Sequence, residues 1–111
     1  MAVIHAKFGE VIDVRPLGAA MAEAVTSTVM KTEAMEILRF VVPAGKVWPT
    51  HAVAGEITVH CLEGRIAFTA GDATVELGAG RMLALAAHTR HSLRGIEAAT
   101  VLVTILLPVS G

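Results

Sequence analysis

Histidine is the residue type in this chain with the clearest capacity for chemistry. The 111 residues include five histidines, and a neutral imidazole both binds metals and anchors polar groups of small molecules. His51 follows a Pro-Thr pair at the entry to an apolar run, and His91 follows the segment 86–90, forty residues later. Both positions are expected where a loop enters a strand. The two side chains can therefore face one another and act together.

The rest of the composition excludes several other chemistries. Cys61 is the only cysteine, so neither an intramolecular disulfide nor a multi-cysteine zinc site is available. The chain has no Asn, Gln or Tyr, which leaves His, Arg, Lys, Ser, Thr, Trp and the carboxylates to recognise a polar ligand. Nine basic and ten acidic residues give a formal charge of −1. That balance offers no basic surplus for nucleic acid.

The charge pattern also bears on membranes and on targeting. No window approaches the roughly 18 uncharged apolar residues that a membrane-spanning helix needs. Charged residues from Lys7 to Arg15 interrupt the N-terminal region, where a signal peptide requires an unbroken apolar core. We therefore expect a cytoplasmic protein that has no membrane partner.

The elements that position the histidines are expected to be mostly β-strands. Apolar runs of strand length recur along the chain, and most of them end at Gly, Pro or Asp. They cover residues 36–42, 57–62, 65–69, 74–77, 82–85 and 101–107. Leu17, Met21 and Val25 recur every four residues behind Pro16, so residues 17–25 are the one helical candidate. The pattern predicts a single all-β domain, a sandwich or a barrel, with at most one short N-terminal helix.

Two of these runs are apolar on both faces of the expected strand. Residues 36–42 place apolar side chains at odd and even positions, and residues 101–107 are nearly continuously apolar. A strand that exposes one side to water should alternate instead. The outer apolar face needs a cover, and we expect a second subunit, and hence a homodimer, to supply it. The alternative is that the N-terminal 30 residues form the cover.

The spacing of Gly and His resembles that of the cupin superfamily. The first cupin motif, a Gly followed by His-x-His, a Glu and a closing Gly, corresponds to Gly45, His51, Val53, Ile57 and Gly64. The second motif, a Gly, a Pro-x-Gly turn and a His, corresponds to Gly80, Ala86, His88 and His91. The resemblance covers about residues 35–107. It implies an RmlC-like jelly-roll β-barrel over 35–111, usually dimeric, with residues 1–34 as a strand or helix arm packed on it.

The resemblance also implies a divalent metal (Zn, Ni, Mn or Fe) held by three His and one Glu, and here the sequence departs from the family. His51 and His91 match two of the four ligands, but Val53 replaces the second His and Ile57 replaces the Glu. Two imidazoles leave most of the coordination to water. Glu56 lies one residue before the family's Glu position, so it becomes a ligand only if a bulge turns it inward.

Strict alternation along residues 56–61 indicates what surrounds the histidines. Ile57, Val59 and Cys61 should face the interior, while Glu56 and His60 face outward. The interior beside His51 would then be apolar, which is typical of a site for a small molecule.

Two functions follow from these residues. The first is a binding module whose barrel takes up a small, partly apolar molecule beside His51 and His91, with further contacts from Val53, Ile57, Trp48 and Arg90. The alternative is a metal-dependent enzyme, dioxygenase-like or isomerase-like, that uses His51, His91 and Glu56. A sensory domain that works with a separate transcription regulator is a third role, which the sequence does not separate from the first.

Overall fold

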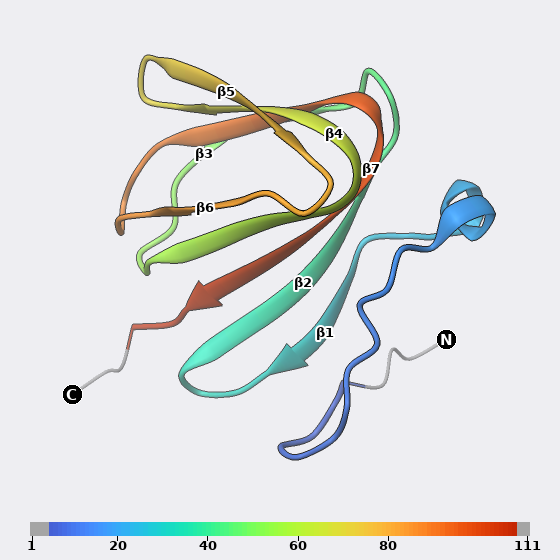
Figure 1. Cartoon of the computed structure of the whole chain (residues 1–111). Helices are drawn as coiled ribbons and strands as arrows, with labels where there is room; N and C mark the ends of the chain where they lie inside the picture. Colours follow the sequence, from blue (N-terminus) through green and yellow to red (C-terminus); the bar gives the residue numbers. More distant parts are fainter. Residues whose placement is uncertain (1–4, 109–111) are drawn as a thin grey trace.

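The computed structural model describes residues 5–108, and most of them form β-strands (Figure 1). The strands are, in chain order, β1 (Ser27–Lys31), β2 (Met35–Val42), β3 (Val47–His51), β4 (Ile57–Ala70), β5 (Ala73–Gly78), β6 (Met82–Leu85) and β7 (His91–Leu106). Every pairing between them is antiparallel. The all-β prediction is confirmed.

The two long strands β4 and β7 pair with one another and organise the barrel. The strand order is β1-β2-β7-β4-β5, while β3 pairs with β7 and β6 pairs with β4. The first part of β7 pairs with β3 and its later part with β2, and β4 divides in the same way between β6 and β5. Each long strand thus belongs to both halves of a jelly roll, which curls around a common interior (Figure 1).

Glycines allow the long strands to bend where the halves meet. The register between β4 and β7 is irregular from Cys61 to Ile66. Gly64 lies there with a φ of +78°, and a Cβ at this position would collide with the carbonyl oxygen of Ala98. The sequence predicts two separate strands here, 57–62 and 65–69, divided at Glu63 and Gly64. That prediction is wrong, because the chain bulges and continues as one strand.

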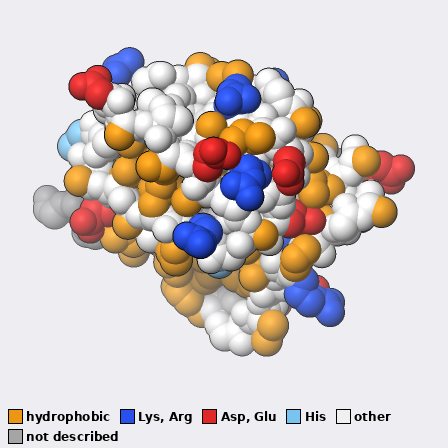
Figure 2. Space-filling model, turned by 45° about the horizontal axis from the view of Figure 1, so that its top comes forward, with side chains coloured by type: hydrophobic (Ala, Val, Ile, Leu, Met, Phe, Trp, Pro, Cys, Tyr) orange, Lys and Arg blue, Asp and Glu red, His pale blue; other side chains and the backbone are white. Residues whose placement is uncertain are grey.

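Charged side chains of both signs are spread over the surface. Figure 2 shows basic and acidic side chains interspersed on the face that it draws, without a patch of a single sign. Among the described residues, 5–108, no helix is long and apolar enough to cross a membrane.

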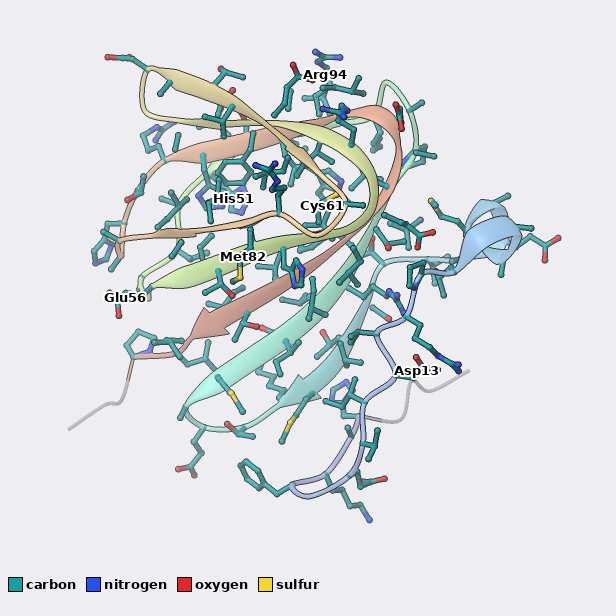
Figure 3. All side chains as sticks on the ribbon, viewed as in Figure 1. Asp13, His51, Glu56, Cys61, Met82 and Arg94 are labelled. Carbon is teal, nitrogen blue, oxygen red and sulfur yellow. The ribbon has the colours of Figure 1, made fainter. Side chains whose placement is uncertain are left out.

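The core follows the two-residue alternation that the sequence predicts. Ile57, Val59 and Cys61 are 4%, 1% and 0% exposed, and Cys61 lies inside the barrel (Figure 3). The largest fully buried side chain is that of Phe68. The remaining buried members of the cluster come from β2, β4, β5 and β7: Val42, Ile66, Leu77, Leu93, Ala99, Val101 and Val103.

The helical candidate forms only a short 3₁₀ helix. The helix η1 (Gly18–Glu23) has no side-chain hydrogen bond at its N-cap and no buried residue. Gly18 begins it with a φ of +58°. A regular α-helix over 17–25 would need a longer apolar face against the barrel, because short helices depend on such packing.

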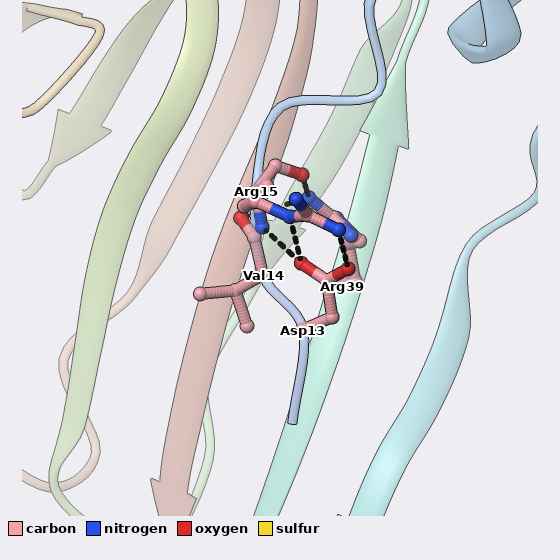
Figure 4. A network of polar contacts seen from close by, with 4 residues as sticks. All are labelled: Asp13, Val14, Arg15 and Arg39. Atoms are coloured by element: carbon pink, nitrogen blue, oxygen red, sulfur yellow. Dashed lines mark hydrogen bonds and ion pairs between the residues drawn. The ribbon is translucent and has the colours of Figure 1, made fainter. Parts of the chain in front are cut away.

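The N-terminal segment lies along the outside of the sheet, where one charged side chain from β2 and one from β4 hold its backbone. Arg39 donates from Nη2 to the carbonyl oxygens of Val14 and Arg15, and Arg15 pairs with Asp13 at 2.8 Å (Figure 4). The Glu63 carboxylate accepts hydrogen bonds from the N–H of Leu17 (2.7 Å), the N–H of Gly18 (3.1 Å) and the hydroxyl of Thr100 (2.7 Å). This segment therefore covers part of the outer face of the sheet.

Candidate functional site

His51 and His91 meet because strands β3 and β7 pair. The two residues are direct partners in the antiparallel register, and cross-strand partners carry neighbouring side chains on one face. Their ring centroids lie 4.3 Å apart at an interplanar angle of 58°. His91 is 6% exposed and stacks on Phe68 at 5.7 Å, whereas His51 is exposed. The pair is anchored in the core on one side and open on the other.

A bulge in β3 brings Trp48 to the same side as His51. Trp48 and His51 are three residues apart, so a regular strand would point them to opposite faces. Their partners Leu93 and His91 are only two apart, which means that β3 has one extra residue here. Pro49 is part of the bulge and has no N–H to offer the ladder. A proline inside a strand run is the sequence signal for such a bulge.

The backbone fixes which nitrogen of each ring is free. Nδ1 of His51 lies 3.2 Å from the carbonyl oxygen of Pro49, and Nδ1 of His91 lies 2.9 Å from that of Thr89. A carbonyl oxygen only accepts, so each Nδ1 carries the proton in these hydrogen bonds. The neutral rings therefore present a lone pair on Nε2.

The pair borders an apolar cavity inside the barrel. The cavity offers about 50 Å³ to the centres of water-sized spheres. One enclosed water needs roughly 10–15 Å³ by this measure, so the space holds a few such volumes. The lining residues are Phe40, Trp48, His51, Val53, Ile57, Val59, His91, Ser92, Leu93, Val103 and Ile105. None of them is Asp, Glu, Lys or Arg.

Trp48 contributes a polar atom whose bonding is incomplete. Its ring packs edge to face on Phe40, with centroids 4.9 Å apart. Its Nε1 is buried and has no hydrogen-bond partner among the described residues. A buried N–H without an acceptor costs about 1–3 kcal/mol.

The donor set does not fit the metal that the cupin resemblance implies. The two imidazoles lie side by side, while Val53 and Ile57, which the resemblance aligns with the other two ligands, line the cavity with apolar side chains. Among residues 5–108 there is no group of three or more His, Cys, Asp or Glu that could hold a metal ion. A metal bound only by these two rings would have to take its remaining ligands from water.

Two of the residues expected at the site lie elsewhere. Glu56 is exposed outside the barrel cavity, beside Ile57, Ala86 and Leu106, and Figure 3 shows its side chain directed away from the interior. The bulge that would turn it inward is absent, because the β4–β6 register is regular from Ile57 onward. Arg90 is exposed and does not line the cavity.

Sequence reasoning missed the residues that come from more distant strands. Phe40 on β2 and Val103 and Ile105 on β7 line the cavity, and Phe68 supports His91 from β4. Their inward positions could be read from alternation, but not their distance from His51. Cys61 plays no visible part in the site, since burial raises the pKa of its thiol and Sγ donates toward the Glu63 carbonyl at 3.4 Å.

Comparison with known proteins places this architecture in a wide group. The family model described as a cupin domain matches residues 38–106, more than half of the chain. No curated protein matches.

Three solved structures illustrate the similarity. A cupin superfamily protein from Desulfitobacterium hafniense has a TM-score of 0.77 at 21% identity, covering 93% of this chain and 100% of that one. An RmlC-like cupin protein from Desulfovibrio desulfuricans has a TM-score of 0.70 at 28% identity, covering 95% and 100%. An RmlC-like cupin with a double-stranded β-helix fold from Methanocaldococcus jannaschii has a TM-score of 0.73 at 17% identity, covering 89% and 94%.

Proposed function

We propose that this chain, which belongs to the cupin family, binds a small and partly apolar molecule in its barrel, with His51 and His91 as the polar anchors. The observation that carries the proposal is the pair of rings whose Nδ1 atoms are both engaged by backbone carbonyls, at the edge of an apolar cavity. Such a cavity, with few polar groups fixed in orientation, is the usual form of a small-molecule site.

The geometry supports a binding site that is set up before the ligand arrives. The strand pairing fixes the backbone of both histidines, and the hydrogen bonds to Pro49 and Thr89 fix their ring nitrogens. A site that needs no rearrangement loses less entropy on binding. The chain thus keeps the cupin scaffold and two of its imidazoles for recognition.

Native mass spectrometry of the purified full chain with a metabolite library tests the proposal. We expect at least one small-molecule adduct on the natural protein and its loss from the His51→Ala variant. His60→Ala is the matched control, because His60 lies on β4 outside the cavity lining, and it should keep the adduct. Failure of every library member to bind would contradict the proposal.

The same preparation tests the alternative, a metal-dependent enzyme. Elemental analysis should find substoichiometric metal in the natural protein, because two imidazoles alone hold a divalent ion weakly. Stoichiometric Zn, Ni, Mn or Fe that disappears when His51 and His91 are replaced together would instead favour the metal-dependent enzyme.

A further inference from the structure

The turn that joins β6 to β7 contains a residue in a conformation that favours glycine (Figure 1). His88 has a φ of +65°, and it is the only non-glycine residue with a positive φ among residues 5–108. The Thr89 N–H lies 3.4 Å from the Ala86 carbonyl oxygen, so His88 is the third of the four residues of this turn. A positive φ at that position is typical of a type II turn, which prefers glycine there. His88 therefore strains the backbone.

Hydrogen bonds from two consecutive residues hold the strained turn in place. His88 donates its N–H to the carbonyl oxygen of Val53, in the loop after β3, at 2.8 Å. The Thr89 hydroxyl donates to the Ala86 carbonyl oxygen, also at 2.8 Å. A strained backbone conformation persists only where its surroundings determine it, and these contacts determine it here.

The same turn contacts two residues that line the cavity from different parts of the chain. Val53 follows β3 and His91 begins β7, and both belong to the lining. The N–H of His88 reaches the backbone of Val53, and the carbonyl oxygen of Thr89 accepts from Nδ1 of His91 at 2.9 Å. The turn thus links the loop after β3 to the ring of His91.

The contact with Thr89 selects one of the states that the His91 ring can adopt. A neutral imidazole carries its proton on either nitrogen, and the ring can rotate by a half turn about the Cβ–Cγ bond. Only a protonated Nδ1 that points at Thr89 makes this hydrogen bond. Because His91 is 6% exposed, water does not readily replace a lost partner. The Thr89 carbonyl therefore fixes both the tautomer and the rotation of the ring.

We propose that His88 and Thr89 are positioning residues of the candidate site, and that their strained turn keeps His91 in one tautomer and one rotation beside Val53. The Thr89 hydroxyl ties its residue to the start of the turn, and this tie places the carbonyl that the His91 ring needs. The inference rests on the proposed function, since it names what keeps that site in its binding form.

Long-range ¹H–¹⁵N NMR of the full chain, labelled with ¹⁵N-histidine, tests the proposal without a ligand. At pH 8 imidazole is ordinarily neutral, and the shifts of its two nitrogens report which one carries the proton. We expect His91 of the natural protein to be protonated at Nδ1. Thr89→Val keeps the branched shape without the hydroxyl and should lower the ratio of Nδ1–H to Nε2–H about fivefold, the effect of one ordinary hydrogen bond. Thr89→Ser keeps the hydroxyl and should keep the ratio.

Two controls separate positioning from general stability. Thr74→Val removes a matching hydroxyl on β5, which bonds to Thr69 at 2.8 Å at an exposed place outside the cavity lining. This variant should leave the His91 tautomer unchanged. The ring signals of His60, which lies outside the lining as well, are the reference within each spectrum and should be the same in every variant.

Substitutions at residue 88 test the strained backbone. His88→Gly should keep the turn, because glycine adopts a positive φ readily. His88→Val should disrupt it, because a β-branched residue is seldom found there. The Val53 carbonyl protects the amide of residue 88, so its protection factor against hydrogen exchange should be about tenfold lower in His88→Val than in His88→Gly. The tautomer ratio of His91 should fall only in the valine variant.

The outcomes separate this inference from the proposed function. Protonation of His91 at Nε2 in the natural protein, or an unchanged ratio in both Thr89→Val and His88→Val, would overturn the positioning role. A fall that also occurs in Thr89→Ser would overturn the part assigned to the hydroxyl. These measurements need no ligand, so such failures leave the proposed function standing. An empty metabolite screen together with the expected NMR results would overturn the proposed function alone.

Discussion

His51 and His91 form one pair but differ in what surrounds them. His91 is 6% exposed and touches Phe68, while His51 is exposed and rests on His91. Large-to-small changes are costly only where the side chain is buried. The two residues should therefore contribute unequally to the stability of the fold.

Alanine substitution at each histidine tests this difference. We expect His91→Ala to lower the free energy of unfolding by about 2–3 kcal/mol, through the lost packing on Phe68. His51→Ala should lower it by less than about 1 kcal/mol. Urea denaturation measures both values. Equal and large losses would show that the His51 ring is part of the core.

Part of the candidate site could be predicted residue by residue from the sequence. His51, His91, Val53, Ile57 and Trp48 follow from motif positions and alternation, and all five line the cavity. The ring tautomers could not be predicted, because they depend on which backbone carbonyls lie beside Nδ1. The buried indole N–H could not be predicted either, since no sequence pattern states whether a buried donor finds an acceptor.

At the level of elements, the bend of β4 at Gly64 lets one strand serve both halves of the barrel. Gly64 and Gly71 both have positive φ, +78° and +60°. A Cβ at Gly64 would collide with the backbone at Ala98, whereas a Cβ at Gly71 would meet open space. A side chain at Gly71 would therefore meet backbone strain alone, whereas a side chain at Gly64 would meet both backbone strain and a steric collision.

Alanine at these two glycines gives a matched comparison. Gly71→Ala should cost about 1–2 kcal/mol of folding stability, the usual price of a left-handed alanine. Gly64→Ala should cost at least about 2 kcal/mol more, because β4 and β7 must also move apart. Thermal or urea denaturation supplies both numbers. Similar losses of unfolding free energy at both positions would contradict this account, because they would mean that β4 and β7 move apart at little cost.

The N-terminal segment depends on the ionisation of Glu63. Partial burial by itself raises the pKa of this carboxyl, but the hydrogen bonds from Leu17, Thr100 and Gly18, together with the charge of Arg39, lower it more, so the pKa lies below its ordinary value. A carboxyl whose pKa falls on folding stabilises the fold above the unfolded-state pKa of about 4.3, and that contribution is lost as the pH drops through the folded-state value.

Acid should therefore loosen the segment that Glu63 holds. We expect the hydrogen-exchange protection of the Leu17 and Gly18 amides to fall at least tenfold between pH 6 and pH 3. Glu63→Gln should lower it already at pH 6 and reduce the unfolding free energy by about 1–2 kcal/mol. Glu76→Gln is the control, since Glu76 pairs loosely with Arg65 at 3.7 Å on the surface. Unchanged protection in Glu63→Gln would contradict the assignment.

Most strands could be predicted from the sequence, but their lengths and joints could not. The apolar runs 36–42 and 82–85 correspond closely to β2 and β6. The runs 57–62 and 65–69 merge into β4 because a glycine bulge continues the ladder that a turn would end. Residues 17–25 do not form an α-helix because so short a helix needs an apolar surface to pack on. The sequence pattern alone does not show whether such a surface is present.

At the level of the whole molecule, the outer face of the sheet is only partly covered. The N-terminal segment lies over Arg39, while Leu102, His60 and Met82 continue across β7, β4 and β6 as neighbours in register. Met82 is 56% exposed. Leu102 and Met82 are the apolar members of this row, and we expect a second copy of the chain to pack over them, because exposed apolar patches often mark interaction sites.

Light scattering during size-exclusion chromatography tests the homodimer. The natural chain should elute with twice the monomer mass at micromolar concentration. Replacing both Met82 and Ala84 with Glu should give a monomer that stays folded, since both side chains are exposed. Val75→Glu, at a 47% exposed position on β5, should remain dimeric. A natural chain that is monomeric at 100-fold higher concentration would contradict the expectation.

The most direct test of the central claim is a crystal structure of the natural protein grown with a compound that forms an adduct in the metabolite screen, refined without assumption about what lies between the two imidazoles. We predict the density of a small organic molecule in the cavity, within hydrogen-bond distance of at least one histidine Nε2. A single strong peak about 2.0–2.1 Å from both Nε2 atoms, the distance of a metal–imidazole bond, would contradict the account. Histidine rings that point apart with side chains filling the space between them would contradict it equally.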